Sequence, residues 1–186
     1  SKESKYFVIC IHPETISSNN EAMILNLLKY IYNNKSYSYI FTYPNSDAHS
    51  NIILRHIKKY VLKNDNCQLI KSAGRYDFLH LIKYSSGIIG NSSSGITEAP
   101  SLNVPTLNIG LRQNGRPCGN SIYQASSSYK SIAQAMNKLK HDQKKRVVIK
   151  SIYQGKNTIQ KVIKLLSTIK LDNIKNKTFK DNINVR

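Results

Sequence analysis

The sequence predicts an α/β fold, in which a mostly parallel sheet carries helices on both of its faces. Short, continuous apolar runs such as residues 6–11 are typical of strands that are buried on both sides. These runs alternate along the chain with segments whose apolar residues recur at helical spacing. Because parallel strands need a long crossover connection, which a helix usually supplies, this alternation indicates βαβ units.

The elements follow one another in a regular order. Strands are predicted at residues 6–11, 37–42, 67–70, 87–90 and 106–109. The first helix follows the capping-box spacing of Ser18 and Glu21 and carries an apolar stripe from Met23 to Ile31. Further helices are predicted at residues 52–61, 77–84, 129–139 and 158–169, with a short one after residue 90. Each predicted strand is therefore followed by a helix before the next strand begins.

The chain of 186 residues, 40% hydrophobic and 20% charged, suffices for one folded domain. We expect this domain at residues 1–170 and a basic tail without apolar periodicity at residues 171–186. No apolar run reaches the roughly 18 residues of a membrane-spanning helix, and no signal segment opens the chain. We therefore expect a cytoplasmic protein with no membrane partner. Residue 1 is Ser rather than Met, which leaves open a fragment of a longer protein or a natural split protein.

The net charge of +18, from 28 basic and 10 acidic residues, raises the question of a nucleic-acid partner. Fifteen of the basic residues lie from Lys130 onward, spread among Asn, Ser and Ile. They lack the arginine-rich or aromatic-interleaved spacing that groove reading or base stacking needs. We therefore expect a solvated surface and no nucleic-acid partner, and a non-catalytic basic binding module stays as an alternative.

The three cysteines, Cys10, Cys67 and Cys118, are odd in number and far apart in the sequence. They form no Cys-x-x-Cys pair, so neither a disulfide framework nor a zinc site is indicated. We expect reduced thiols, no metal and no cofactor.

The segment Gly-Asn-Ser-Ser-Ser-Gly-Ile-Thr-Glu-Ala-Pro after the fourth predicted strand has the character of a phosphate-binding turn. It leads from a strand into a short helix, so we expect the backbone N–H groups of residues 93–96 to face an anion. The hydroxyls of Ser92, Ser93 and Ser94 add donors, and the small Gly95 lets a diphosphate approach the main chain. An ordinary Ser/Gly turn that caps a helix is the other interpretation.

Glu98 lies in the short helix that this turn opens. A carboxylate can accept hydrogen bonds from two vicinal hydroxyls, so Glu98 is a candidate partner for a sugar diol. The other interpretation is an acidic residue favoured by the helix macrodipole near a helix start.

Polar residues also follow three other predicted strands. His12 comes directly after the first strand, and Asn45 and Asp47 come after the second. Arg112 and Arg116 lie in a glycine-rich loop after the fifth strand, where they could clamp phosphate oxygens in bidentate fashion. Because ligands bind beyond the carboxyl ends of parallel strands, we expect these loops to meet the serine turn at one edge of the sheet.

Four motifs occur here in a recognisable order and spacing. They are His-Pro-x-Thr, Pro-Asn-x-Asp-Ala, Gly-Asn-Ser-Ser-Ser-Gly-Ile-x-Glu-Ala and Asn-Ile-Gly-x-Arg-Gln-x-Gly-Arg. Together they resemble the carboxyl-terminal half of the hydrolysing UDP-N-acetylglucosamine 2-epimerases, from about His12 to about Ile169. The resemblance implies a Rossmann-like domain that is one half of the two-domain GT-B architecture.

The resemblance also implies a reaction, in which UDP-N-acetylglucosamine and water give N-acetylmannosamine and UDP for the biosynthesis of sialic-acid-like nonulosonates. UDP and a UDP-amino-sugar are then the ligands of this half. The contacts implied are Ser92 and Ser93 to the diphosphate, Glu98 to the ribose, and Asn45 and Arg112 around the nucleotide. Asp47, Ser94, Gly95 and Arg116 complete the candidate binding residues. His12 is the candidate catalytic residue, assisting the departure of UDP.

The acid and base carboxylates of the family come mainly from its amino-terminal half. The resemblance therefore implies a missing amino-terminal catalytic domain as a partner, and an isolated chain that turns nothing over. The sequence leaves the oligomeric state open, a homo-oligomer included. A non-hydrolysing epimerase half and a GT-B glycosyltransferase half stay as alternatives, although the His-Pro and Asn-Ser-Ser residues fit the hydrolysing branch better.

Two positions outside these motifs bear on the resemblance. His49 stands where relatives usually carry Gly, and we expect it to be a surface loop residue. Gly74 and Arg75, ahead of the third predicted helix, resemble the family segment near the uracil.

Overall fold

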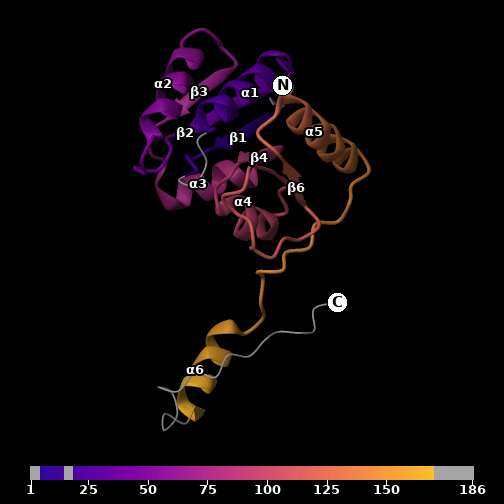
Figure 1. Cartoon of the computed structure of the whole chain (residues 1–186). Helices are drawn as coiled ribbons and strands as arrows, with labels where there is room; N and C mark the ends of the chain where they lie inside the picture. Colours follow the sequence, from indigo (N-terminus) through magenta and orange to yellow (C-terminus); the bar gives the residue numbers. More distant parts are fainter. Residues whose placement is uncertain (1–4, 15–18, 170–186) are drawn as a thin grey trace. The chain divides into compact units, whose positions relative to one another are not determined.

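A computed structural model of the chain describes residues 5–14 and 19–169 (Figure 1). Its centre is a six-stranded sheet in the order β3-β2-β1-β4-β5-β6, and every pair of neighbouring strands is parallel. The strands are β1 Tyr6–Cys10, β2 Ser38–Thr42, β3 Cys67–Ile70, β4 Gly87–Gly90, β5 Thr106–Ile109 and β6 Ile122–Ala125. The predicted α/β fold with a parallel sheet is therefore confirmed.

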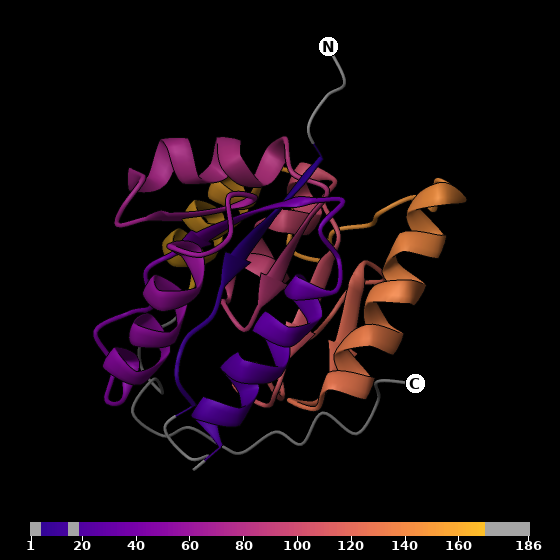
Figure 2. The same cartoon turned by 90° about the horizontal axis from the view of Figure 1, so that it is seen from above.

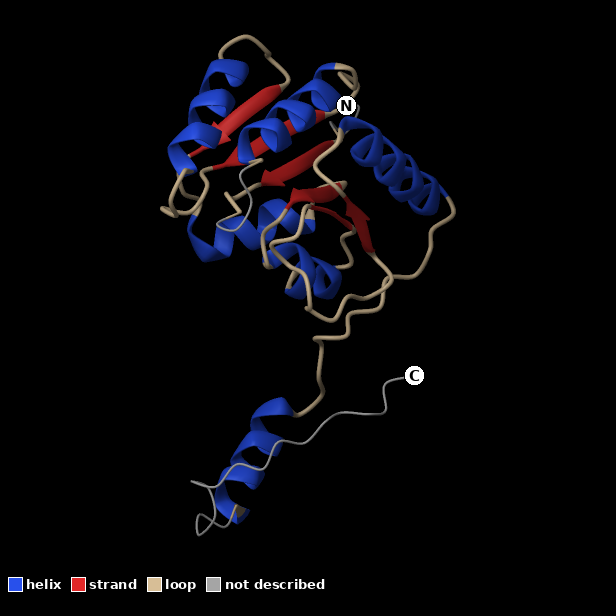
Figure 3. Cartoon of the chain, in the orientation of Figure 1, coloured by secondary structure: helices blue, strands red, loops and turns tan. Residues whose placement is uncertain are grey.

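Helices connect the strands and cover the sheet on both sides (Figure 3). They are α1 Asn20–Tyr32, α2 Ser50–Val61, α3 Gly74–Lys83, α4 Ser94–Thr97, the 3-10 helix η1 Ala99–Leu102 and α5 Tyr129–Lys144, and a further helix, α6 Thr158–Thr168, belongs to a separate unit of the chain. None of the helices in the described part of the chain is long and apolar enough to cross a membrane.

The core has two parts because alternate residues of β1 point to opposite faces of the sheet. Phe7 and Ile9 pack with buried residues of α1, α2 and α5, and α1 and α5 lie side by side on that face (Figure 2). Val8 and Cys10 pack on the other face with residues of α3 and η1, among them Ile82. Burial on both faces explains why β1 appears in the sequence as a continuous apolar run.

The strand order reverses between β1 and β4. The chain runs outward from β1 through β2 to β3, and then returns to β4 on the other side of β1. The loops that leave β1 and β4 therefore diverge, which opens a crevice at the carboxyl ends of these two strands. The two strands also approach closely, because Gly90 has a φ of 143° and a Cβ there would collide with the carbonyl of Cys10. The fold thus fixes where a ligand site belongs.

Several elements differ from the sequence prediction, and three of the differences have a clear reason. The strand β6 was not predicted, because its four residues include the exposed Gln124 and form no continuous apolar run. The helix α1 begins at Asn20 with Asn19 as its N-cap, so the predicted capping box does not start it, and Ser18 lies outside the described residues. The helix α5 extends to Lys144, five residues beyond the predicted end, which was placed at its last buried residue, Leu139, because the following turn is only half-buried or exposed.

The chain divides into two compact units, Ser1–Gln154 and Gly155–Arg186. The first contains the whole sheet, and the second contains α6. The predicted domain end near residue 170 stays a prediction, and the predicted tail at residues 171–186 lies outside the described residues.

His49 is held in a strained backbone conformation. It is the N-cap of α2 and has a φ of 67°, in the left-handed region where glycine is favoured. We expect His49→Gly to raise the free energy of unfolding by about 0.5–1 kcal/mol and the Tm by about 2–4 °C, because the relief of strain exceeds the added freedom of the unfolded chain. Thermal unfolding of the two proteins measures this effect.

The matched control is Asn51→Gly, two positions further on in the first turn of α2. Glycine inside a helix is unfavourable, so this variant should lower the Tm. A lower Tm for His49→Gly as well would show that the left-handed backbone at position 49 is not strained.

Candidate functional site

A hollow of about 400 Å³ lies in the crevice beyond the carboxyl ends of the strands. Its lining comes from the ends of β1 to β4, the loops that follow them and α3, and it comprises Cys10, His12, Thr42, Tyr43, Asn45, Lys71, Ser72, Ala73, Gly74, Arg75, Phe78, Ser92 and Ser94. The predicted convergence of the loops after the first, second and fourth strands is therefore observed. The segment Gly74–Arg75 joins them from the start of α3.

Asn91, in the loop after β4, links this loop to the loops after β1 and β5. Its side chain is fully buried, accepts a hydrogen bond from the backbone N–H of His12 at 2.7 Å and donates one to the His12 carbonyl at 2.8 Å. The carbonyl oxygen of Asn91 accepts hydrogen bonds from Arg112 Nη1 at 3.2 Å and from Gln113 Nε2 at 2.8 Å. The loops after β1, β4 and β5 are consequently fixed against one another.

The ring of His12 has a defined tautomer. The backbone N–H of Asn45 donates a hydrogen bond to His12 Nδ1 at 3.0 Å, so Nδ1 carries no proton. The proton of the neutral ring is therefore on Nε2, which lies 3.5 Å from the Sγ atom of Cys10. Burial, with the nearby Arg112 guanidinium as the second cause, lowers the pKa of His12 to about 4. At neutral pH this side chain is an uncharged hydrogen-bond donor.

Arg112 lies at the rim of the site and forms an ion pair with Asp47, another of the predicted site residues. Its Nη2 atom is 3.7 Å from Oδ2 of Asp47, in the loop after β2. Its Nη1 atom donates to the carbonyl of Asn91. A guanidinium has five N–H donors in a planar fork, so donors remain for the oxygens of an anionic ligand.

Glu14 is a residue of the site whose role the sequence did not indicate. Its Oε1 atom accepts hydrogen bonds from the backbone N–H groups of Leu111 at 2.6 Å and Arg112 at 3.1 Å. Gly110 permits this approach, since its φ is 81° and a Cβ there would collide with the carboxylate. Glu14 thus fixes the main chain that carries Arg112. The sequence feature that could have indicated this role is the position of Glu14, two residues after His12 in a loop that follows a strand.

The serine turn is built differently from the prediction. Ser92 and Ser94 line the hollow, but the N–H of Gly95 donates to the Ser92 carbonyl at 3.1 Å and the N–H of Ile96 donates to the Ser93 carbonyl at 2.9 Å. The expectation that these two N–H groups face an anion is therefore wrong, because the turn satisfies them internally.

Gly95 is needed for packing. It is buried, its carbonyl accepts a hydrogen bond from the Thr106 hydroxyl at 2.6 Å, and an added Cβ would lie 2.6 Å from Thr106 Cγ2. The small residue lets α4 lie against β5.

Six of the ten predicted residues do not line the hollow, namely Asp47, Ser93, Gly95, Glu98, Arg112 and Arg116. Glu98 is both the C-cap of the four-residue α4 and the N-cap of η1, so the helix-start interpretation stays open beside the sugar-diol one. Arg116 is exposed in the loop after β5, where its N–H donates to the Gln113 carbonyl at 3.2 Å. Ser93 belongs to the turn without being among the lining residues. Lys71, Ser72 and Phe78 line the hollow and were missed.

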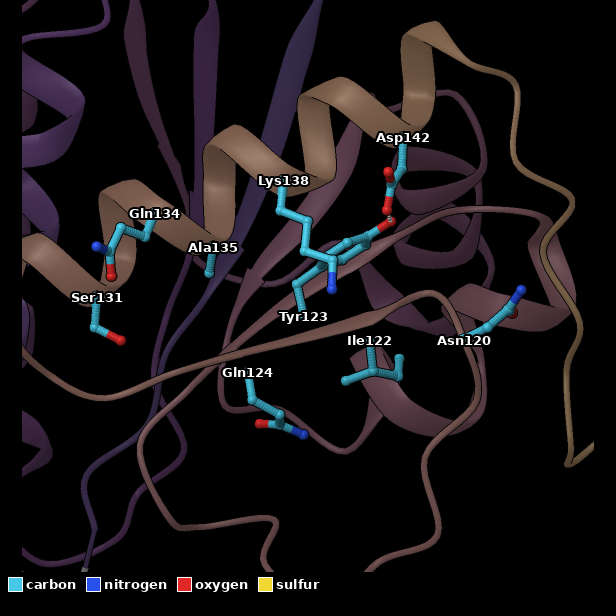
Figure 4. Close-up of a pocket in the computed structure, with 9 residues that line it drawn as sticks. All are labelled: Asn120, Ile122, Tyr123, Gln124, Ser131, Gln134, Ala135, Lys138 and Asp142. Atoms are coloured by element: carbon cyan, nitrogen blue, oxygen red, sulfur yellow. Dashed lines mark hydrogen bonds between the residues drawn. The ribbon is translucent and has the colours of Figure 1, made fainter.

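Another hollow, of about 370 Å³, lies at the edge of the sheet between β6 and α5 (Figure 4). It is lined mainly by polar side chains, and the hydroxyl of Tyr123 donates to Asp142 Oδ2 at 2.9 Å across it. None of the residues predicted for the site lies there.

Comparison with known proteins identifies the family. Residues 1–167 match the family model described as UDP-N-acetylglucosamine 2-epimerase. The chain belongs to this family. Among similar proteins, the polysialic acid biosynthesis protein P7 of Escherichia coli is 36% identical over 95% of this chain and 46% of that protein. The hydrolysing GDP/UDP-N,N'-diacetylbacillosamine 2-epimerase of Campylobacter jejuni is 34% identical over 96% of this chain and 47% of that protein.

The fold is also that of solved 2-epimerases. The UDP-GlcNAc 2-epimerase of Neisseria meningitidis, solved with UDP-GlcNAc bound, has a TM-score of 0.72 at 20% identity, over 90% of this chain and 46% of that chain. The present chain spans about half the length of the curated relatives it matches. Its fold is one half of the two-domain GT-B architecture.

The bridge made by Asn91 predicts a stability effect in this 2-epimerase chain. In Asn91→Asp the shape is kept, but a carboxylate oxygen replaces the N–H donor that faces the His12 carbonyl. We expect the free energy of unfolding to fall by about 2 kcal/mol or more, because two buried acceptors then face each other. Urea denaturation measures it. Asn114→Asp, at an exposed position of the Arg112 loop, is the control, and equal losses in the two variants would contradict the role of Asn91.

The low pKa of His12 predicts a pH dependence. Between about pH 6.5 and pH 4 the unfolded chain binds a proton at His12 that the folded chain does not. The stability linked to this ring is therefore complete above pH 6.5 and is lost as the pH falls towards 4. Between pH 7 and pH 4, we expect wild type to lose about 3 kcal/mol more unfolding free energy than His12→Gln.

An NMR titration of the histidine rings tests the same point without relying on the fold of the variant. The resonance that His12→Gln removes should titrate near pH 4. A midpoint at or above pH 6.5 would show that the ring is charged or solvated in the folded chain.

Proposed function

We propose that this chain is the UDP-binding half of a hydrolysing UDP-N-acetylglucosamine 2-epimerase, which converts UDP-N-acetylglucosamine and water to N-acetylmannosamine and UDP. The observation that carries the proposal is the gathering of Ser92, Ser94, His12 and Asn45 around one hollow at the switch point of the sheet, with Arg112 bound to Asn91 beside it. Hydroxyl donors and a guanidinium are the groups that hold a diphosphate.

The hydrolysing form of the reaction is supported by the relatives and by the motifs. The similar protein of Campylobacter jejuni is named as a hydrolysing 2-epimerase, and that of Escherichia coli as a polysialic acid biosynthesis protein. The His-Pro sequence after β1 and the Asn-Ser-Ser sequence after β4 are those of the hydrolysing branch that this chain resembles. We therefore place the chain in the biosynthesis of a sialic-acid-like nonulosonate.

The reaction begins with elimination of UDP across C1 and C2 of the sugar and ends with addition of water, which inverts C2. The residues of this half act on the leaving group. Arg112 and the hydroxyls of Ser92 and Ser93 stabilise the charge that develops on the departing diphosphate. His12 exchanges its weak contact with Cys10 for a hydrogen bond from Nε2 to a diphosphate oxygen. Because the ring is neutral, it assists as a hydrogen-bond donor and not as a charged acid.

The other binding residues surround the nucleoside part. Asp47 positions the guanidinium of Arg112. Asn45 fixes the ring of His12 and borders the hollow, as does the segment Gly74–Arg75. Glu98 accepts from the ribose hydroxyls, and Arg116 reaches the ligand from the loop after β5. The roles of Glu98 and Arg116 are proposed from the motifs alone. In the loop after β5, the hydrogen bonds to the Asn91 carbonyl, at 2.8 Å and 3.2 Å, come from Gln113 and Arg112 and not from Arg116.

The proposed functional unit needs a second domain. In this proposal residues 1–170 are the UDP-binding domain, and an amino-terminal catalytic domain supplies the carboxylates that move the C2 proton. Support comes from the length of the curated relatives, about half of which this chain covers. The isolated chain then binds UDP and turns nothing over. With the completing domain present, release of free N-acetylmannosamine supports the proposal, whereas UDP-N-acetylmannosamine would assign a non-hydrolysing reaction.

UDP binding by the chain is the direct test. We expect UDP to raise the Tm with saturation, because a ligand that binds only the folded state stabilises it by mass action. Arg112→Ala should raise the Kd for UDP at least about tenfold, through the loss of charge-assisted hydrogen bonds. Arg55→Ala, which removes an exposed arginine from α2, is the control with the same change in charge and should bind as wild type does. Equal UDP affinities of the two variants would remove Arg112 from the site.

A further inference from the structure

A cavity of about 540 Å³ lies at the opposite end of the sheet from the hollow described above. Its lining residues directly precede β1, β2 and β4 or belong to the last turns of α5, and they are Lys5, Ser36, Tyr37, Ser86, Lys140, Gln143 and Lys144. Residues before the strands are at the amino ends of the sheet, whereas His12 and Ser92 follow the carboxyl ends. The two sites are therefore separate. A volume of this size is within the range of about 300–1,000 Å³ that holds small ligands.

Lys140 is the best-ordered cation of this cavity. Its Nζ atom donates hydrogen bonds to the hydroxyl of Tyr30 at 3.0 Å and to Oδ1 of Asn34 at 3.2 Å. The ammonium also lies over the ring of Tyr37, 4.8 Å from its centroid, and 5.6 Å from the centroid of the Tyr30 ring. These contacts hold the charge in place without neutralising it. Burial lowers the pKa of Lys140, as expected for an ammonium partly withdrawn from water.

The charge of the cavity is of one sign. Three of the seven lining residues are lysines and none is a carboxylate. An ammonium has three donors and Lys140 uses two on protein groups. Ser36 and Ser86 add hydroxyl groups to the lining, and the side-chain amide of Gln143 is held by the Ser86 carbonyl. A polar, cationic cavity with this donor set is complementary to an anion that accepts several hydrogen bonds.

We propose that this cavity, lined by Lys5, Lys140 and Lys144, is a binding site for a phosphate group, distinct from the nucleotide site. The phosphate is free or belongs to a small organic phosphate whose remaining atoms pack beside Tyr37. Its dianion compensates the charge of Lys140 and draws together the ends of β1 and α5. The site does not depend on the proposed function, because it shares no residue with the hollow at the other end of the sheet.

The test measures the Tm of the full chain against inorganic phosphate and glucose 6-phosphate at constant ionic strength. All variants carry Arg112→Ala, which weakens the nucleotide site. We expect saturable stabilisation by at least one probe, and an increase of its Kd of at least tenfold in Lys5→Ala/Lys144→Ala. Lys5 and Lys144 are exposed, so this variant should fold. Tighter binding of glucose 6-phosphate identifies an organic phosphate, and equal binding identifies the free ion.

The control is Lys138→Ala/Lys150→Ala, which removes the same charge. Lys138 is on α5 but lines the other hollow (Figure 4), and Lys150 lines neither. This variant should keep the Kd of the Arg112→Ala chain with all its lysines. Equal weakening in the two double variants would reduce the effect to net charge and overturn the proposal, as would the absence of saturable stabilisation by both probes.

Lys140→Met adds a second measurement, because it keeps the length of the side chain and removes its charge. We expect it to lose phosphate stabilisation as the Lys5 and Lys144 variant does. Retained stabilisation in Lys140→Met would also overturn the proposal. UDP binding in chains with an intact Arg112 is measured separately, so a failure of the nucleotide site and a failure of the phosphate site give different results.

Discussion

The pair of hydrogen bonds between the Asn91 amide and the backbone of His12 is the interaction on which the rest of the site depends. It joins the first residues after two adjacent central strands at the point where the strand order reverses. The same residue offers its carbonyl to Arg112 and Gln113, so the third loop takes its position from the first two. A side chain that both donates and accepts is required, which explains an amide in a fully buried position.

The close approach of β1 and β4 at their carboxyl ends helps to hold Asn91 and His12 in place. Gly90 lies against the Cys10 carbonyl, and the polar residues Asn91 and His12 follow these two strand ends after one and two positions. Core packing and site geometry are consequently coupled over a few residues, since Val8 and Cys10 belong to one core layer and Phe7 and Ile9 to the other. A change in the separation of these strands would be felt at His12 before it reached the outer strands.

The sequence was informative wherever a local pattern decides the structure. The apolar runs located five strands, because strands buried on both faces need them, and the position of polar residues after those strands located His12, Asn45 and Ser92. The strand β6 lacks such a run, since only Ala125 among its four residues is buried and Gln124 is exposed. The bonds of Asn91 and Glu14 join residues 79 and 97 positions apart, and no local pattern records such partners. The internal hydrogen bonds of the N–H groups in the serine turn could not be predicted either, because the four-residue α4 is too short to show a helical period in the sequence.

The carboxylate of Glu14 has a consequence for how an anion can be held. It occupies the two successive amides of Leu111 and Arg112, which would otherwise form a concave pocket for a negatively charged group. An anionic ligand cannot use these two N–H groups, because the Glu14 carboxylate already binds them. The main chain at these two positions is therefore closed to an anionic ligand, and the loop after β5 can attract one there only through side chains such as that of Arg112.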